Sequence, residues 1–147
     1  MPDNKYLPRV AYFCMEYGLS EDLPIYAGGL GILAGDILKE AHDAELPLIG
    51  VGILWKEGYT SQFIDERGWP YDKPTAYDPD LLQDTGIVIH VIVRGEEIPV
   101  RVWRVDAYGN APLYLLDTAL PGSDHGWITN RLYGGGDQDR IAQEIIL

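Results

Sequence analysis

Three glycines stand within four positions in the run Gly28-Gly29-Leu30-Gly31, directly before a stretch with the hydrophobic period of a helix. Because glycine has no β-carbon, its backbone N–H can approach a ligand closely and its chain can turn where other residues cannot. The start of a helix adds partial positive charge and free N–H groups. The turn therefore predicts a binding site for phosphate or another anion. The same glycines would also suit a plain connection between a strand and a helix.

The surrounding residues disfavour the two standard nucleotide-binding motifs. No Lys-Ser or Lys-Thr pair follows the glycines, as a Walker A loop requires, and the dinucleotide spacing G-x-G-x-x-G is not met. If an anion binds here, the sequence does not predict that it belongs to a nucleotide held in either of these ways.

The helix after the glycines is predicted from the spacing of its apolar residues. One face carries Leu30, Leu33, Ala34, Ile37, Leu38 and Ala41. Asp36 lies on the other face, together with further charged residues. We expect the helix to end near Leu46, since Pro47 supplies no backbone N–H and restricts the residue before it.

Two apolar runs flank this helix and read as strands. Residues 9–15 are nearly continuously apolar, which predicts a strand buried on both faces, and residues 48–55 form a second run. Strand, helix and strand make a βαβ unit with a right-handed crossover and a ligand crevice at the carboxyl ends of the strands. Glu16 follows the first strand, where it could orient a sugar hydroxyl or a neighbouring amide, or simply be a solvated or capping acid.

The remaining chain predicts one hairpin, one further strand and one helix. Residues 87–93 and 98–105 flank a short polar turn and predict an antiparallel hairpin, with Pro99 indicating an edge strand. Residues 113–116 predict a strand, and residues 137–147 predict a helix capped by Asp137. This last helix ends on apolar residues without a stop signal, so we expect the sequence to be a piece of a longer polypeptide.

Residues 56–80 contain many turn residues and five aromatic side chains. The aromatic residues are Tyr59, Phe63, Trp69, Tyr71 and Tyr77. Exposed aromatic rings can serve as platforms for sugar rings, whereas aromatic residues in long loops more often fix the loop to the core. We favour the second interpretation.

Composition and charge exclude several classes of partner. The 147 residues suit one domain, and the net charge of −12 argues against nucleic acid and against a polyanionic membrane surface. Neutral sugars remain open. No apolar run has the length of a membrane span and the first residues lack the apolar core of a secretory signal, so a cytoplasmic protein is expected.

The cysteine and histidines predict neither a disulfide nor a metal site. Cys14 is the only cysteine, and we expect it to be a small buried hydrophobic residue. The histidines at 42, 90 and 125 share no metal-ligand spacing, so no metal is expected.

Several blocks resemble one enzyme family, in order and over most of the chain. The blocks comprise residues 11–19, 23–36, 46–52, 58–59 with Gln62, 115–118, 131–135, 137–138 and 140–144. Together they resemble the amino-terminal region of α-glucan phosphorylases, above all the short bacterial and archaeal branch. The glycine run alone would also suit a glycogen or starch synthase.

The resemblance implies that residues 1–147 form part of the N-terminal Rossmann-like lobe of a two-lobed GT-B glycosyltransferase, with an antiparallel hairpin insertion in an α/β fold. Such enzymes transfer a glucosyl unit from α-1,4-glucan to inorganic phosphate, with retention, and give glucose 1-phosphate. In the family the turn matched by Gly28, Gly29, Leu30 and Gly31 faces the phosphates and the glucosyl site. Glu16, Tyr17 and Asp36 are further residues expected to line the cleft.

The resemblance also implies a pyridoxal 5′-phosphate cofactor whose attachment lysine lies beyond Leu147, in a lobe that this chain lacks. No catalytic residue is therefore expected in the chain, which should be inactive alone, and a homo-oligomer of the full-length enzyme is left open. Two other functions also remain open: a synthase-type glucosyltransferase that uses a nucleotide sugar, and a non-catalytic module that binds glucan or protein.

Overall fold

The computed structural model describes residues 7–58, 60–133 and 135–147, and of Pro74 it describes the backbone alone. Predictions that involve Met1 to Lys5, Tyr59 or Gly134 lie outside this description.

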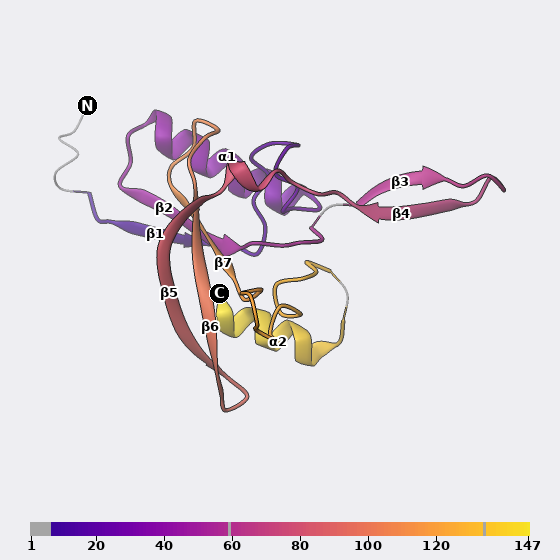
Figure 1. The fold of residues 1–147 in the computed structure, drawn as a ribbon. Coiled ribbons are helices and arrows are strands. Elements are labelled where there is room, and N and C mark those ends of the chain that lie inside the picture. The colour runs from indigo at the N-terminus through magenta and orange to yellow at the C-terminus, as the bar shows by residue number, and fades with distance from the viewer. Residues whose placement is uncertain (1–6, 59, 134) are drawn as a thin grey trace.

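The centre of the structure is a mixed sheet with the strand order β1-β2-β7-β6-β5 (Figure 1). The strands are β1 (Val10–Phe13), β2 (Leu48–Ile53), β5 (Gln83–Val93), β6 (Glu96–Val105) and β7 (Leu113–Asp117). β1, β2 and β7 run parallel to one another, and β6 and β5 extend the sheet in antiparallel pairing. Helix α1 (Gly29–Asp43) connects β1 to β2, so the predicted βαβ unit is confirmed in a mixed α/β fold.

The two helices cover opposite faces of this sheet, as strand β7 shows. Leu113 and Leu115 belong to the buried cluster that contains Leu38 of α1. Leu116 belongs to the other buried cluster, with Ile146 of α2 (Asp137–Ile146). Because successive residues of a strand point to opposite faces, α1 and α2 must lie on different sides of the sheet.

The buried face of α1 differs from the predicted one. Leu30 and Leu33 were expected to be buried, but their side chains are 51% and 57% exposed. The buried residues are mostly small: Gly31, Ala34, Gly35, Leu38 and Ala41. The prediction is confirmed for Ala34, Leu38 and Ala41. It is wrong for Leu30 and Leu33, because α1 lies so close to the chain after β1 that small residues fill most of the contact there. The helix also ends at Asp43, three residues before Leu46.

Strand β1 is an edge strand rather than a strand buried on both faces. Among the described strands it pairs only with β2, and its Val10 and Phe13 side chains are exposed. The apolar run that predicted a buried strand continues beyond β1, and there Cys14 is buried as expected.

The predicted hairpin is confirmed as β5 and β6, joined by a turn in which Arg94 and Gly95 have φ of +55° and +81°. It is part of the main sheet rather than an insertion. The edge position inferred from Pro99 is wrong, since β6 lies between β5 and β7. The part of β6 that pairs with β7 is Arg101–Val105, so Pro99 lies beyond the end of β7, where its missing N–H breaks no pairing with that strand.

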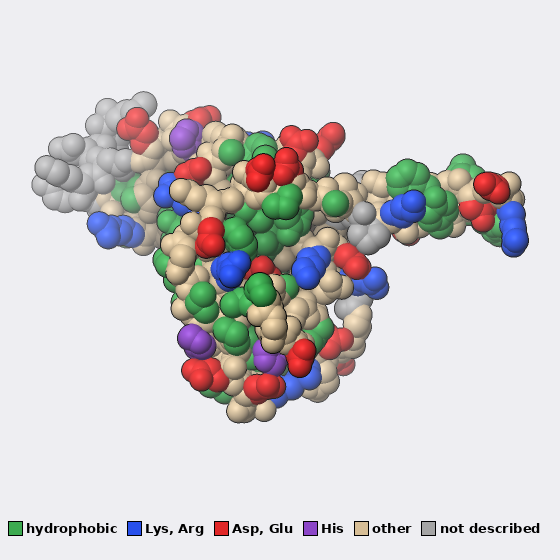
Figure 2. Space-filling model, in the orientation of Figure 1, with side chains coloured by type: hydrophobic (Ala, Val, Ile, Leu, Met, Phe, Trp, Pro, Cys, Tyr) green, Lys and Arg blue, Asp and Glu red, His purple; other side chains and the backbone are tan. Residues whose placement is uncertain are grey.

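The inserted hairpin is formed instead by β3 (Thr60–Ile64) and β4 (Pro70–Pro74), a separate two-stranded sheet that projects from the body (Figure 1). Phe63, Trp69 and Tyr71 are exposed on it, so the expectation that they fix a loop to the core is wrong. Tyr77, beyond the hairpin, does pack against the core. Figure 2 shows hydrophobic side chains along this projecting arm. A short 3-10 helix, Pro79–Leu81, leads on to β5.

Helix α2 begins at Asp137, but its N-cap is Gly136, so the prediction that Asp137 caps the helix is wrong. The Asp139 carboxylate accepts a hydrogen bond of 3.1 Å from the Gly136 N–H, and the Asp139 N–H donates to the Gly136 carbonyl. Asp137 is instead an acid in the first turn, where its charge suits the helix dipole. Within the described residues, no helix is both long and apolar enough to cross a membrane.

Candidate functional site

The glycine turn stands at the start of α1, after the carboxyl end of β1. Gly28 precedes the helix in an extended conformation, no side chain caps the helix, and no acid lies in its first turn. The amides of Gly31 and Ile32 donate to the Gly28 carbonyl, at 3.1 and 3.4 Å. Among the described residues, the amides of Gly29 and Leu30 have no acceptor, as expected for the first N–H groups of a helix.

Glu16 holds the other side of this turn. Its side chain is only 2% exposed. Its Oε2 accepts hydrogen bonds from the amides of Ala27 at 2.7 Å and Gly28 at 3.2 Å. Its Oε1 accepts a hydrogen bond of 2.8 Å from the hydroxyl of Tyr133. Among the roles considered from the sequence, this geometry displays the orientation of neighbouring amides, and the burial of Glu16 rules out a solvated acid.

The glycines of the turn differ in the space around them. A β-carbon at Gly28 or Gly29 would meet nothing within 4 Å. A β-carbon at Gly31 would stand 2.5 Å from Tyr26 Cβ and 3.0 Å from the Glu16 carboxylate. Gly31 is therefore required by the packing of the chain itself, whereas the open space at Gly28 and Gly29 is available to a ligand.

A pocket of about 490 Å³ begins beside the turn. Three distant segments line it: Ala27; Glu57, Gly58, Thr60 and Asp72; and Arg131 and Tyr133. The Arg131 guanidinium donates to the Glu57 carboxylate at 2.7 Å. None of Gly28 to Gly31 is in the wall, so the turn opens onto the surface beside this pocket rather than into it.

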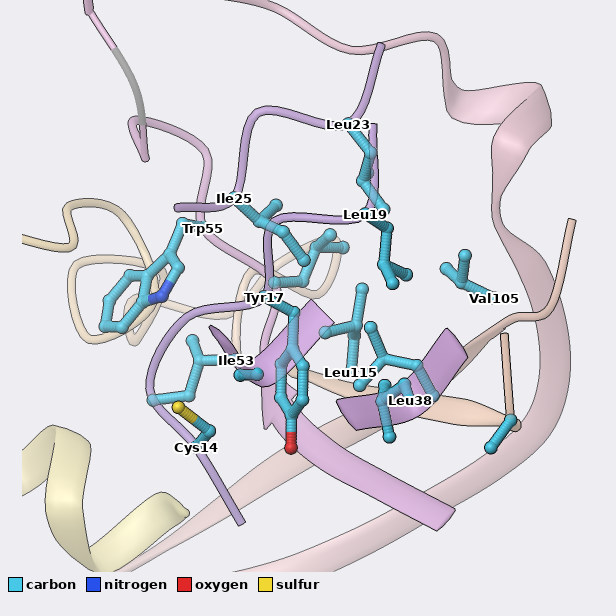
Figure 3. Packing of buried hydrophobic residues seen from close by; sticks show 14 of the residues in the cluster. Cys14, Tyr17, Leu19, Leu23, Ile25, Leu38, Ile53, Trp55, Val105 and Leu115 are labelled. Carbon is cyan, nitrogen blue, oxygen red and sulfur yellow. The ribbon is translucent and has the colours of Figure 1, made fainter. Parts of the chain in front are cut away.

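Tyr17 and Asp36, also expected to line a cleft, differ in exposure to solvent. Tyr17 is fully buried, and its hydroxyl donates to the Tyr12 carbonyl at 2.5 Å. Figure 3 shows its ring within the core beside labelled residues such as Leu38 and Cys14. Burial raises the pKa of Tyr17. Asp36 is exposed on α1. The structure thus joins Glu16 to the glycine turn, whereas Tyr17 can act on the turn only through packing.

Tyr133 and the pocket were not identified as site residues from the sequence. Tyr133 lies 117 positions from Glu16, and no local spacing links the two residues. The hydrogen bond to Glu16 is the main cause that raises the pKa of Tyr133. The sequence signal was present only in the resemblance, because residues 131–135 form one of the matching blocks.

The described residues offer no cluster typical of a metal site. No group of three or more His, Cys, Asp or Glu side chains in this part of the chain could hold a metal ion. His125 approaches Glu96 at 3.4 Å, and His42 and His90 are exposed. The chemistry of the site is therefore that of backbone amides, carboxylates, an arginine and a tyrosine.

The chain is similar in sequence to bacterial and archaeal phosphorylases. It is 40% identical to a glycogen phosphorylase of Mycobacterium tuberculosis, over 93% of this chain and 17% of that protein. It is 41% identical to a maltodextrin phosphorylase of Thermococcus litoralis, over 97% of this chain and 18% of that protein. A glycogen phosphorylase of Aquifex aeolicus is 38% identical, over 99% of this chain and 22% of its own length.

No protein-family model matches the chain. The chain spans about a fifth of the length of these relatives, 17% to 22%. The resemblance to α-glucan phosphorylases that the sequence motifs indicated is nevertheless confirmed, over nearly the whole of this chain.

Proposed function

We propose that the polypeptide containing this chain is an α-glucan phosphorylase. It transfers a glucosyl unit from α-1,4-glucan to inorganic phosphate, with retention, and releases glucose 1-phosphate. Residues 1–147 contribute part of the N-terminal Rossmann-like lobe of a two-lobed GT-B enzyme. The printed names of the relatives support this class of reaction, and an acidic protein such as this one suits a neutral glucan better than a polyanion.

The observation that carries the proposal is the pair of open amides at Gly29 and Leu30. They stand at the positive end of a helix with neither a side-chain cap nor a first-turn acid. Backbone amides of this kind stabilise oxyanions without any reorganisation during a reaction. We assign Gly28 to Gly31 to binding the oxyanion of phosphate or glucose 1-phosphate, with the Leu30 side chain, exposed at 51%, beside the glucosyl unit.

The described residues do not provide a complete pyridoxal 5′-phosphate site, because none of their lysines is placed to attach the cofactor. Its lysines are Lys5, Lys39, Lys56 and Lys73. None of the three described lysines lines the pocket beside the turn, and Lys73 stands over the rings of Phe63 and Tyr71 on the projecting hairpin. We place the attachment lysine outside these residues.

The division of the site between two lobes predicts that the 147-residue chain alone is inactive. The full protein would act in the cytoplasm, where its phosphate substrate is available, and a homo-oligomer is compatible with the proposal. In this chain the turn lies open, and the second lobe would face it across the cleft.

A phosphorolysis assay tests the proposed function. The natural polypeptide that contains residues 1–147, incubated with maltodextrin and phosphate, should release glucose 1-phosphate, and the 147-residue chain should not. Omission of phosphate should abolish release. Glucosyl transfer from ADP-glucose to maltodextrin without dependence on phosphate would instead favour a synthase, and binding of maltodextrin without turnover would favour a non-catalytic module.

A further inference from the structure

We infer that Glu16 is a positioning residue of the glycine turn, locked in place by Tyr133, and that it determines which amides remain open to an oxyanion. The inference rests on the proposed function and adds to it two side chains whose role is to hold the backbone. Neither side chain needs to touch the reacting atoms.

The first step is the burial of the Glu16 carboxylate. A carboxylate removed from water is costly unless hydrogen bonds replace its hydration. Glu16 has three such bonds, two from Ala27 and Gly28 and one from Tyr133. These bonds therefore fix the turn in place, because their loss would leave a buried charge without donors.

The second step is the selection of amides. Glu16 takes the N–H groups of Ala27 and Gly28, while Gly31 N–H bonds to the Gly28 carbonyl. The amides of Gly29 and Leu30 are left between these occupied groups. A ligand oxyanion is thus directed to the two adjacent amides of Gly29 and Leu30. The negative charge of Glu16 disfavours binding of an anion at the amides of Ala27 and Gly28, which Glu16 occupies.

The third step is the coupling between Glu16 and the start of α1. Gly31 leaves room for the carboxylate, since a β-carbon there would stand 3.0 Å from Glu16 Oε2. Gly18 N–H, two residues after Glu16, donates to the Gly31 carbonyl at 2.8 Å. The segment that carries Glu16 therefore fixes the helix start through both a side chain and the backbone.

The fourth step is the position of Tyr133. Its side chain is largely exposed and lines the pocket beside the turn together with Ala27 and Arg131, while its hydroxyl donates a hydrogen bond to Glu16. Removal of this hydroxyl would take one donor from the carboxylate without opening a cavity in the core. Tyr133→Phe is therefore a milder test of the same arrangement than a change at Glu16.

The test combines amide exchange with kinetics in the natural polypeptide that contains this chain. In Glu16→Gln, hydrogen exchange of the amides of Ala27 and Gly28 should become about tenfold faster or more, since their charged acceptor is lost. The KM for phosphate should rise about tenfold, while the KM for maltodextrin changes much less. Tyr133→Phe should move both quantities in the same direction by a smaller factor.

Glu40→Gln is the matched control, because Glu40 is an exposed carboxylate further along α1. It should leave both amide exchange and kinetics unchanged.

Unchanged exchange at Ala27 and Gly28 in both Glu16→Gln and Tyr133→Phe would overturn the inference. An equal rise in the KM values for phosphate and for maltodextrin would also overturn it. If the unsubstituted protein releases no glucose 1-phosphate, the proposed function fails. Faster exchange of the Ala27 and Gly28 amides in Glu16→Gln would then still support the role of Glu16 in fixing the glycine turn. If Glu16→Gln does not fold, Tyr133→Phe decides by the same two readouts.

Discussion

Gly35 of α1 lies directly against the carbonyl group of Gly18, so closely that a β-carbon at position 35 would overlap the Gly18 oxygen. This contact brings the helix onto the segment that follows β1 and places the glycine turn beside Glu16. Gly35→Ala should therefore destabilise the chain, because its methyl group must displace backbone rather than a flexible side chain. We expect a loss of about 1 to 3 kcal/mol in the free energy of unfolding, measured by urea denaturation.

Gly29→Ala provides the matched comparison in the same helix. Its β-carbon would meet nothing within 4 Å. Since alanine favours a helix over glycine, this variant should be as stable as the parent or more stable by up to about 1 kcal/mol. A loss of stability as large as that of Gly35→Ala would contradict the open surroundings of Gly29.

The same Gly29→Ala substitution should lower phosphorolysis sharply in the full protein. A methyl group at this position would stand beside the two open amides, where the proposed oxyanion binds, and about tenfold or more of turnover should be lost. Gly31→Val should lose both activity and stability, because its side chain would collide with Tyr26 and Glu16. Full activity of both variants, measured by release of glucose 1-phosphate, would remove the turn from the mechanism.

The sequence predicted the elements whose signals are local. The glycine run, the apolar period and Pro47 indicated α1, and β-branched runs around a polar turn indicated β5 and β6. The buried face of α1 could not be predicted, because a hydrophobic pattern selects Leu30 and Leu33, whereas close approach to Gly18 selects small residues. The short hairpin of β3 and β4 was missed because its glycine and proline residues are typical of a loop. Its aromatic side chains are exposed, so they give no pattern of a buried strand face.

The candidate site shows the same division. Gly28 to Gly31 and Glu16 were predicted as site residues from local patterns, since the glycines stand at the start of α1 and Glu16 follows β1. Tyr133 was not found, because its hydrogen bond to Glu16 spans 117 positions and only the folded chain brings the two residues together. Tyr17 illustrates the opposite case: it was expected to line the cleft, but its side chain is fully buried in the core.

Two tryptophans should respond very differently to truncation. Trp55 is fully buried and its indole N–H donates to the Met15 carbonyl at 2.6 Å, whereas Trp69 is 71% exposed on the projecting hairpin. Trp55→Ala should cost about 3 to 5 kcal/mol of unfolding free energy, and Trp69→Ala less than about 0.5 kcal/mol. Urea denaturation of both variants checks this. A comparable loss in Trp69→Ala would mean that the hairpin arm packs against the body in solution.

Alkaline pH should destabilise the fold through buried tyrosines. Burial, followed by the charge of Asp117, raises the pKa of Tyr77 from 10.0 to about 12, and burial raises that of Tyr17 as well. The folded state thus favours the neutral phenols. The contribution of Tyr77 to stability is complete below pH 10 and is lost as the pH rises through about 12, because the phenol of the unfolded chain releases its proton first. Urea denaturation across this range should show a falling free energy of unfolding, and Tyr77→Phe should make the fall less steep. An equally steep fall in that variant would contradict the burial of the Tyr77 hydroxyl.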